Sequence, residues 1–160
     1  QDAEVLRQNV YERQAKTRES RTKLEKQLAA AHIEAKFAWE KGATEAEMKP
    51  ILQLIRSSQW RWDYAFASHG ASFHAPQEVQ RLFSDGLVQV QDARLMLSKV
   101  LAKHGFIGDV PMPDISTKAK AQEYIGLDMK TLRDKKQRFL KEIEPKWIEE
   151  AKKNGKLIEI

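Results

Sequence analysis

The feature that most constrains the fold is the spacing of apolar residues, which follows a helical period over three long stretches. Within residues 2–41, apolar side chains recur every three or four positions from Leu24 to Ala38, in a stretch otherwise rich in helix-forming residues, and they do so across residues 50–68 and 76–104. Valine, isoleucine and threonine are not gathered into alternating runs, so no strand is predicted. Gly42 and Gly105 follow the first and third stretches, where a glycine can end a helix. The sequence therefore predicts an all-α protein built as a bundle of long helices.

The first and third stretches each carry an apolar stripe that a single helix cannot bury against itself. The first stripe consists of Leu24, Leu28, Ala31, Ala35 and Ala38. The second consists of Val79, Leu82, Phe83, Gly86, Val90, Ala93, Leu97, Val100 and Leu101. Such stripes need another helix or another chain to cover them. We predict a homodimer formed through residues 2–41 and 76–104, with Leu28 and Leu97 in its interface.

The second stretch is preceded by a helix-start signal and interrupted by a proline. Thr44 and Glu47 form a capping box, which predicts a helix start at that point. Pro50 predicts a kink or a restart, because a helix interior needs the N–H that proline lacks. Beyond it, one face is predicted to be core: Ile51, Leu54, Ile55, Ser58, Trp62, Ala65 and Phe66. Trp60 and Tyr64 point elsewhere, so this helix has a second, aromatic face.

The C-terminal third changes character at a Pro-rich loop, predicted at residues 109–115. Pro111 and Pro113 resist both helix and sheet there. Short helices are expected beyond the loop, the last of them broken in two by Pro145. Despite this change, we assign residues 1–160 to a single helical domain.

Composition excludes several classes of function. The chain has 28 basic and 23 acidic residues interspersed along it, which indicates a solvated helical surface and makes a nucleic-acid binder the weakest alternative. No stretch is long and apolar enough to cross a membrane. No Ser-His-Asp set, phosphate-binding loop or metalloprotease motif can be assembled. We therefore do not expect this segment alone to be catalytic.

One histidine stands out by its position. The aromatic stretch 59–76 runs into a glycine-containing bend that presents His74 just before Pro76, where a new helix can begin. A histidine on a short loop between two helices can reach a partner outside its own bundle. It is a candidate metal ligand, although most loop histidines only form a hydrogen bond or face water.

A resemblance makes that role specific. The chain resembles the C-terminal region of the ammonia-forming cytochrome c nitrite reductases, most closely in Trp60-Arg61-Trp62-Asp63, Ala67-Ser68-His69-Gly70 and Phe73-His74-Ala75-Pro76. Residues 113–118, 125–127 and 153–155 fit the same family in the same order. The resemblance implies that His74 is the distal axial ligand of a haem iron in one electron-relay haem. That role is not carried over to His69.

The resemblance also implies the rest of a larger enzyme. The members of the family that the chain resembles reduce nitrite to ammonium in the periplasm, form dimers, and receive electrons from a membrane-anchored multihaem quinol dehydrogenase. They carry five haem c groups attached through cysteines, whereas this chain has no cysteine. We therefore expect haem attachment, the nitrite pocket and a calcium site to lie upstream, so that His74 is the only cofactor-binding residue assigned here. The alternative is a stand-alone helical module for protein interaction.

Overall fold

The computed structural model describes residues 2–68 and 70–157, and in these ranges it is helical with no strand. This confirms the predicted all-α class. The chain divides into two compact units, Gln1–Met112 and Pro113–Ile160, and each is described here by itself. The division falls in the Pro-rich segment. Whether both units fold as the single domain expected over 1–160 stays a prediction.

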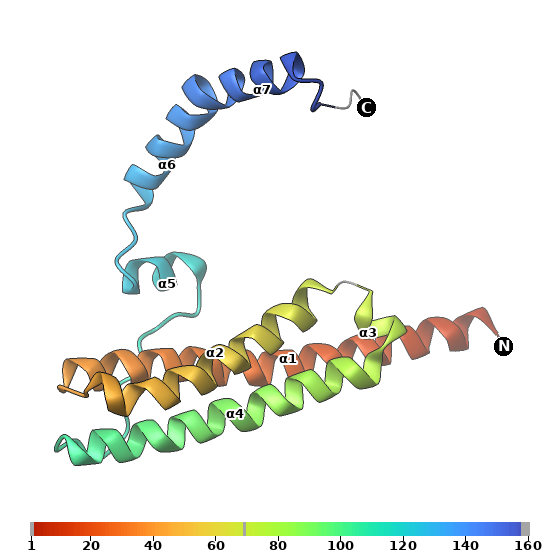
Figure 1. Cartoon of the computed structure of the whole chain (residues 1–160). Helices are drawn as coiled ribbons and strands as arrows, with labels where there is room; N and C mark the ends of the chain where they lie inside the picture. Colours follow the sequence, from red (N-terminus) through yellow and green to blue (C-terminus); the bar gives the residue numbers. More distant parts are fainter. Residues whose placement is uncertain (1, 69, 158–160) are drawn as a thin grey trace. The chain divides into compact units, whose positions relative to one another are not determined.

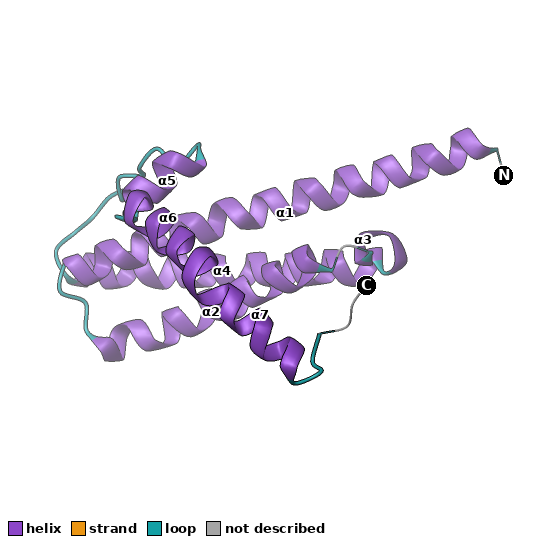
Figure 2. Ribbon diagram, turned by 90° about the horizontal axis from the view of Figure 1, so that it is seen from above, coloured by secondary structure: helices purple, strands orange, loops and turns teal. Residues whose placement is uncertain are grey.

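The first unit is a bundle of three long helices and one short one. These are α1 (Ala3–Glu40), α2 (Glu45–Ala67), α3 (Ala71–His74) and α4 (Pro76–Lys103). Helix α2 runs antiparallel to α1 and α4, and the N-terminal part of α1 extends beyond the other helices (Figures 1 and 2). Within the described residues, no helix is both long and apolar enough to cross a membrane.

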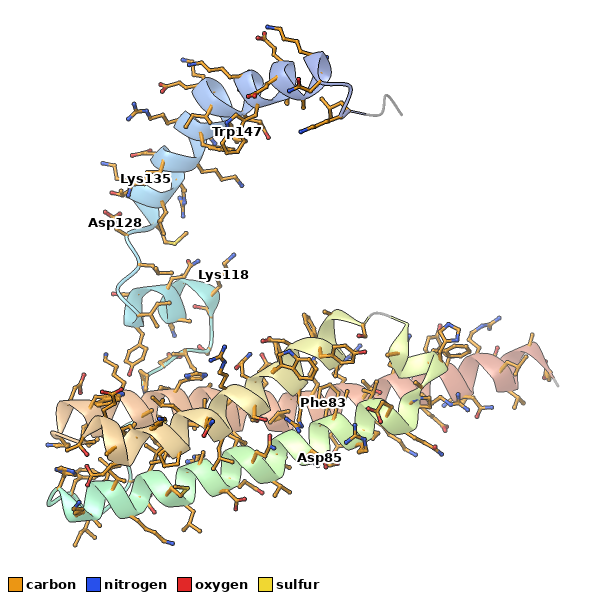
Figure 3. All side chains as sticks on the ribbon, viewed as in Figure 1. Phe83, Asp85, Lys118, Asp128, Lys135 and Trp147 are labelled. Carbon is orange, nitrogen blue, oxygen red and sulfur yellow. The ribbon has the colours of Figure 1, made fainter. Side chains whose placement is uncertain are left out.

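The core of this unit lies where α1, α2 and α4 meet. Its largest fully buried side chains are Leu24, Met48, Ile51, Ile55, Ser58, Val79, Phe83, Val90 and Leu97. Gly86 allows α4 to come close to α1, because a Cβ atom there would lie 2.9 Å from Cδ2 of Leu24. Ser58 Oγ donates a hydrogen bond of 2.7 Å to the carbonyl oxygen of Gly86, which satisfies the one buried polar residue among those that the structure describes. Phe83 belongs to the buried face of α4, whereas Asp85 pairs with Arg81 at the surface (Figure 3).

The helix ends follow the sequence signals closely. Gly42 and Gly105 have φ values of +93° and +80°, which glycine adopts without steric cost. The Thr44 capping box is present, with Glu47 N–H donating to Thr44 Oγ1 and Thr44 N–H donating to the Glu47 carboxylate. Helix α2 therefore begins at Glu45 and not at residue 50. It continues past Pro50, so the predicted restart at the proline was wrong.

Two assignments of apolar residues are corrected. The stripes proposed for a dimer interface form the core of this unit, since Leu28 is 3% and Leu97 is 0% exposed. Helical period identifies a face that must be covered, but it does not identify the helix or chain that covers it. Phe66, predicted to lie in the core, is 47% exposed because it lies near the end of α2.

The second unit has helices but no core. It contains α5 (Lys118–Tyr124), α6 (Met129–Arg138), a π-helical turn η1 (Phe139–Ile143) and α7 (Glu144–Lys153). None of its described residues is buried. The break predicted at Pro145 is replaced by the π-turn, which lies just before the proline and carries the helical backbone into α7. Phe139 and Trp147 meet edge to face across this turn, with ring centroids 5.2 Å apart.

Candidate functional site

The candidate site is the bend that joins α2 to α4 and contains the short helix α3. Helix α2 ends at Ala67, and the Ala71 N–H then donates to the Ser68 carbonyl oxygen at 2.9 Å. Helix α3 closes with the Ala75 N–H donating to the Ala71 carbonyl oxygen at 2.8 Å. Pro76 follows as the first residue of α4, where its missing N–H costs no hydrogen bond. The bend is thus held at both ends and presents the last residue of α3, His74.

The imidazole of His74 is exposed and is positioned by two neighbours. A Cβ atom at Gly70 would lie 3.3 Å from His74 Cδ2 and 3.9 Å from Nε2, so the missing side chain leaves room for the ring. The Phe73 ring meets the imidazole at an interplanar angle of 87°, with centroids 5.3 Å apart. Neither ring nitrogen of His74 forms a hydrogen bond within the described part of the chain. Both nitrogens are therefore available, one to bind a metal and the other to donate a hydrogen bond.

The bend can supply one metal ligand but not a complete coordination shell. Among the described residues, no group of three or more His, Cys, Asp or Glu side chains could hold a metal ion. A zinc or calcium site built by this chain would need several such ligands. A haem iron needs only one residue on each axial side, because the porphyrin supplies the other four donors. The geometry of His74 fits that simpler requirement.

The other histidines do not share this arrangement. His104 Nε2 lies 3.0 Å from Glu47 Oε2 at the opposite end of the bundle, where it helps to join α4 to α2. The Lys103 ammonium, the Thr44 N–H and His104 all act on that carboxylate and hold the pKa of Glu47 well below its usual range. His32 is exposed on α1. His69, to which no ligand role was given, lies outside the described residues.

The aromatic residues of α2 form two stacked pairs, one exposed and one against α1. Trp60 and Tyr64 stack with centroids 5.3 Å apart, and both are more than half exposed. Trp62 and Phe66 stack at 5.0 Å, and the Arg21 guanidinium of α1 lies 5.1 Å over the Phe66 ring. The predicted separation of Trp60 and Tyr64 from the core face is confirmed.

Sequence reasoning missed a basic cavity between α1 and α3. It is lined by Gln14, Thr17, Arg18, Arg21 and Ser72. The spacing of Arg18 and Arg21 shows that they lie one helical turn apart. No pattern in the sequence shows that Ser72, more than fifty residues away, packs against that turn.

Comparison with known proteins shows the family to which the chain belongs. The family model described as "Cytochrome c552" matches residues 1–156. The chain belongs to the Cytochrome c552 family. Three relatives are named cytochrome c-552, and this chain spans about a third of the length of each. The protein of Bacteroides thetaiotaomicron is 66% identical over 96% of this chain and 31% of its own length. Those of Bacteroides fragilis and Porphyromonas gingivalis are each 60% identical, over 98% and 97% of this chain and 32% and 31% of their own lengths.

The Cytochrome c552 match corrects the narrower identification made from the sequence. We predicted the C-terminal domain of a pentahaem, ammonia-forming nitrite reductase, but the family and relatives found are named only as cytochrome c552. The predicted identity and the nitrite-reducing function were therefore wrong, and the alternative of a stand-alone interaction module gains no support either. The motif at residues 60–63 lies within α2, and the motif at residues 73–76 includes the end of α3 and presents a histidine. Both describe a scaffold with one candidate ligand, and a shared scaffold does not specify a reaction.

Membership of the Cytochrome c552 family indicates the class of protein to which this segment belongs. The family and its relatives are named as cytochromes c, which are redox proteins that carry haem c. The chain has no cysteine, so it provides no thioether attachment for a haem. It does provide an exposed, unpaired imidazole on a well-defined bend, which fits an axial ligand of a haem attached elsewhere.

Proposed function

We propose that the bend between α2 and α4 supplies His74 as the distal axial ligand of a haem c, in a cytochrome that transfers electrons. The observation that carries this proposal is the His74 ring itself, which is exposed, lies over Gly70 and forms no hydrogen bond to a described residue. A buried or paired histidine could not reach an iron outside its own bundle. Membership of a haem c family makes iron the metal that this ring would bind.

We further propose that the haem is attached through cysteines outside these 160 residues, in an upstream part of a longer polypeptide. Two facts support this: the chain lacks cysteine, and it spans about a third of the length of its relatives. The helical unit would then be a platform that brings one ligand to a haem held by another segment. The calcium site that the resemblance implies would also lie in that upstream part.

Each part of the bend has a role in this mechanism. When bound, haem c supplies a one-electron couple between ferric and ferrous iron. His74 would hold the haem iron through a ring nitrogen, and an iron held by protein ligands on both faces would favour electron transfer over substrate binding. Gly70 and Pro76 set the position of the ring by leaving space beneath it and fixing the start of α4. The second ring nitrogen remains free to donate to water or to a carbonyl oxygen, which would fix the tautomer.

The proposal includes three further features expected from the sequence. The protein would be periplasmic and would receive electrons from a membrane-anchored multihaem quinol dehydrogenase.

The protein would also form a homodimer, through a surface other than the buried stripes. Val88 and Leu95 lie seven residues apart on α4, so they share one face, and they are 58% and 56% exposed. Exposed apolar residues of this spacing suit a contact with a second copy of the chain.

The test is the spin state of the haems in a His74→Ala variant of the full-length holo-protein. Electron paramagnetic resonance should show that one low-spin haem has become high-spin or water-ligated. His32→Ala is the matched control, because it removes an exposed histidine from the same helical unit without touching the bend. His69→Ala should also leave ligation intact. A His74→Ala spectrum identical to that of wild type would exclude His74 as a ligand.

A further inference from the structure

Beside the bend, the basic cavity between α1 and α3 has the features of an anion site. It has a volume of about 290 Å³ and is lined by Gln14, Thr17, Arg18, Arg21 and Ser72. The lining contains two guanidinium groups and two hydroxyl groups, all of which can donate hydrogen bonds. None of the described residues that line it is acidic.

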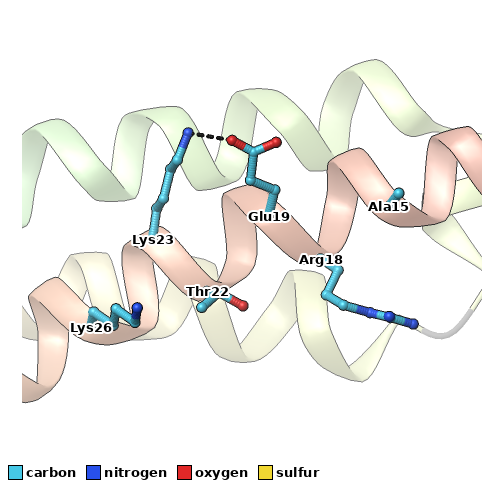
Figure 4. Close-up of a pocket in the computed structure, with 6 residues that line it drawn as sticks. All are labelled: Ala15, Arg18, Glu19, Thr22, Lys23 and Lys26. Atoms are coloured by element: carbon cyan, nitrogen blue, oxygen red, sulfur yellow. Dashed lines mark hydrogen bonds and ion pairs between the residues drawn. The ribbon is translucent and has the colours of Figure 1, made fainter.

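Neither arginine has an anionic partner among the described residues. The ion pairs of α1 join Arg7 to Glu4, Lys23 to Glu19, Lys36 to Glu40 and Glu34 to Arg94, and none includes Arg18 or Arg21. Arg18 also lines a second groove on α1, which contains the Glu19–Lys23 ion pair. Figure 4 shows that the Arg18 side chain extends away from this pair. Two unpaired guanidinium groups one turn apart therefore face the same cavity.

The buried Nε atom of Arg21 gives a second, independent reason to expect a ligand in this cavity. This atom has no hydrogen-bond partner among the described residues. A buried donor without a partner is unfavourable in a folded protein, and an unseen ion or ligand commonly accounts for it. The guanidinium carbon also lies 5.1 Å from the centroid of the Phe66 ring, a cation–π contact. The planar guanidinium of an arginine suits recognition of a carboxylate or a phosphate.

We propose that Arg18 and Arg21, assisted by Thr17 and Ser72, bind a carboxylate, and that this carboxylate is a propionate of the haem ligated by His74. The second half of this statement rests on the proposed function. Ser72 lines the cavity and His74 carries the ligand, and they lie two residues apart on the same short helix, α3. A single porphyrin presents both an iron and propionate groups, so one haem can engage both. The cavity would orient the haem and neutralise its propionate.

The test measures haem reduction potentials in the holo-protein by spectroelectrochemical titration. Arg21→Gln and Arg18→Gln should each lower the potential of one haem and leave all haems low-spin, because removing a nearby positive charge favours the ferric form. Arg21→Lys keeps the charge and should restore most of the potential, which a purely structural defect would not allow. Arg13→Gln is the control, since it removes the same charge from α1 outside the cavity.

The outcomes separate this inference from the proposed function. If His74→Ala changes the spin state while Arg18→Gln and Arg21→Gln leave every potential unchanged, the propionate site is refuted and the ligand assignment stands. An equal shift in Arg13→Gln would refute it too, since the effect would then reflect net charge alone. If inorganic phosphate shifts a wild-type potential in a saturable way, and the arginine variants abolish that response, the cavity binds a free anion and the propionate assignment is wrong.

Discussion

At the scale of single residues, Gly86 marks a tight approach of α4 to α1, because a Cβ atom at this position would lie 2.9 Å from Cδ2 of Leu24. The α4 backbone comes so near to α1 and α2 that Gly86 also accepts the hydrogen bond from Ser58. Gly86→Ala should lower the free energy of unfolding by about 1–3 kcal/mol, the usual cost of overpacking a core, although alanine favours a helix. Urea denaturation would measure this change. Gln91→Ala, at an exposed position of the same helix, should stay within about 0.5 kcal/mol of wild type.

Glu47 predicts how stability depends on pH. Its pKa in the folded protein is lowered, chiefly by the Lys103 hydrogen bond and then by the Thr44 N–H. Its stabilising contribution is therefore fully present above the pKa of an unfolded glutamate, about 4.3, and is lost as the pH falls below it. Glu47→Gln should be less stable than wild type at pH 7, and this difference should shrink toward pH 3.

Urea unfolding at the two pH values would check the Glu47 prediction. Glu25→Gln is a suitable control, because Glu25 is exposed on α1 and has no ion pair among the described residues. A difference between Glu47→Gln and wild type that stayed constant from pH 7 to pH 3 would show that the carboxylate charge contributes nothing.

At the scale of helices, local signals in the sequence predicted most of the boundaries. Gly42, Gly105 and the Thr44 capping box act within a few residues, so their effects can be read without the tertiary structure. The restart expected at Pro50 does not occur, because the Thr44 capping box already starts α2 and the helix continues through the proline at the loss of one backbone hydrogen bond. The π-turn before Pro145 was not predicted, because no local signal distinguishes a helix that ends before a proline from one that continues through a π-helical turn.

The candidate site was predictable only in part. The bend and the position of His74 follow from glycine and proline placement, but its role as a ligand came from resemblance and stays a prediction. The Arg18 and Arg21 cavity depends on contacts between α1 and α3, far apart in the chain. Whether an apolar stripe faces its own bundle or a second copy also depends on tertiary packing. For this reason Leu28 and Leu97 were assigned to the wrong surface.

Helix α4 offers a matched pair of positions that separates folding from dimerisation. Leu97 is fully buried and Leu95 is 56% exposed, only two residues away. Leu97→Glu should unfold the bundle, because it places an unpaired charge in the core. Leu95→Glu should remain folded by circular dichroism and should convert the proposed dimer to a monomer in analytical ultracentrifugation. If Leu95→Glu stayed dimeric at low concentration, the outer face of α4 would not be the interface.

At the scale of the whole molecule, the bundle is suited to be a rigid support for the bend. Arg94 of α4 forms a two-pronged ion pair with Glu34 of α1 and a 2.5 Å hydrogen bond to Gln27. The Glu34 side chain is only 12% exposed, so this pair is better shielded from water than the pairs at the surface. Ser20 of α1 also donates to Gln80 of α4 at 2.7 Å. These contacts fix α4 on α1, and Pro76 at the start of α4 follows His74 by two residues.

If the imidazole of His74 binds a haem iron from outside its own bundle, removing the side chain should leave that iron without one of its ligands. The most direct test is a His74→Gly variant of the full-length holo-protein, titrated with free imidazole and followed by electronic absorption and electron paramagnetic resonance. Without imidazole, one haem should lose its low-spin signal. Added imidazole should restore that signal in a saturable way, because it can occupy the space that the side chain has left. A variant whose haems all stay low-spin before imidazole is added would contradict the account.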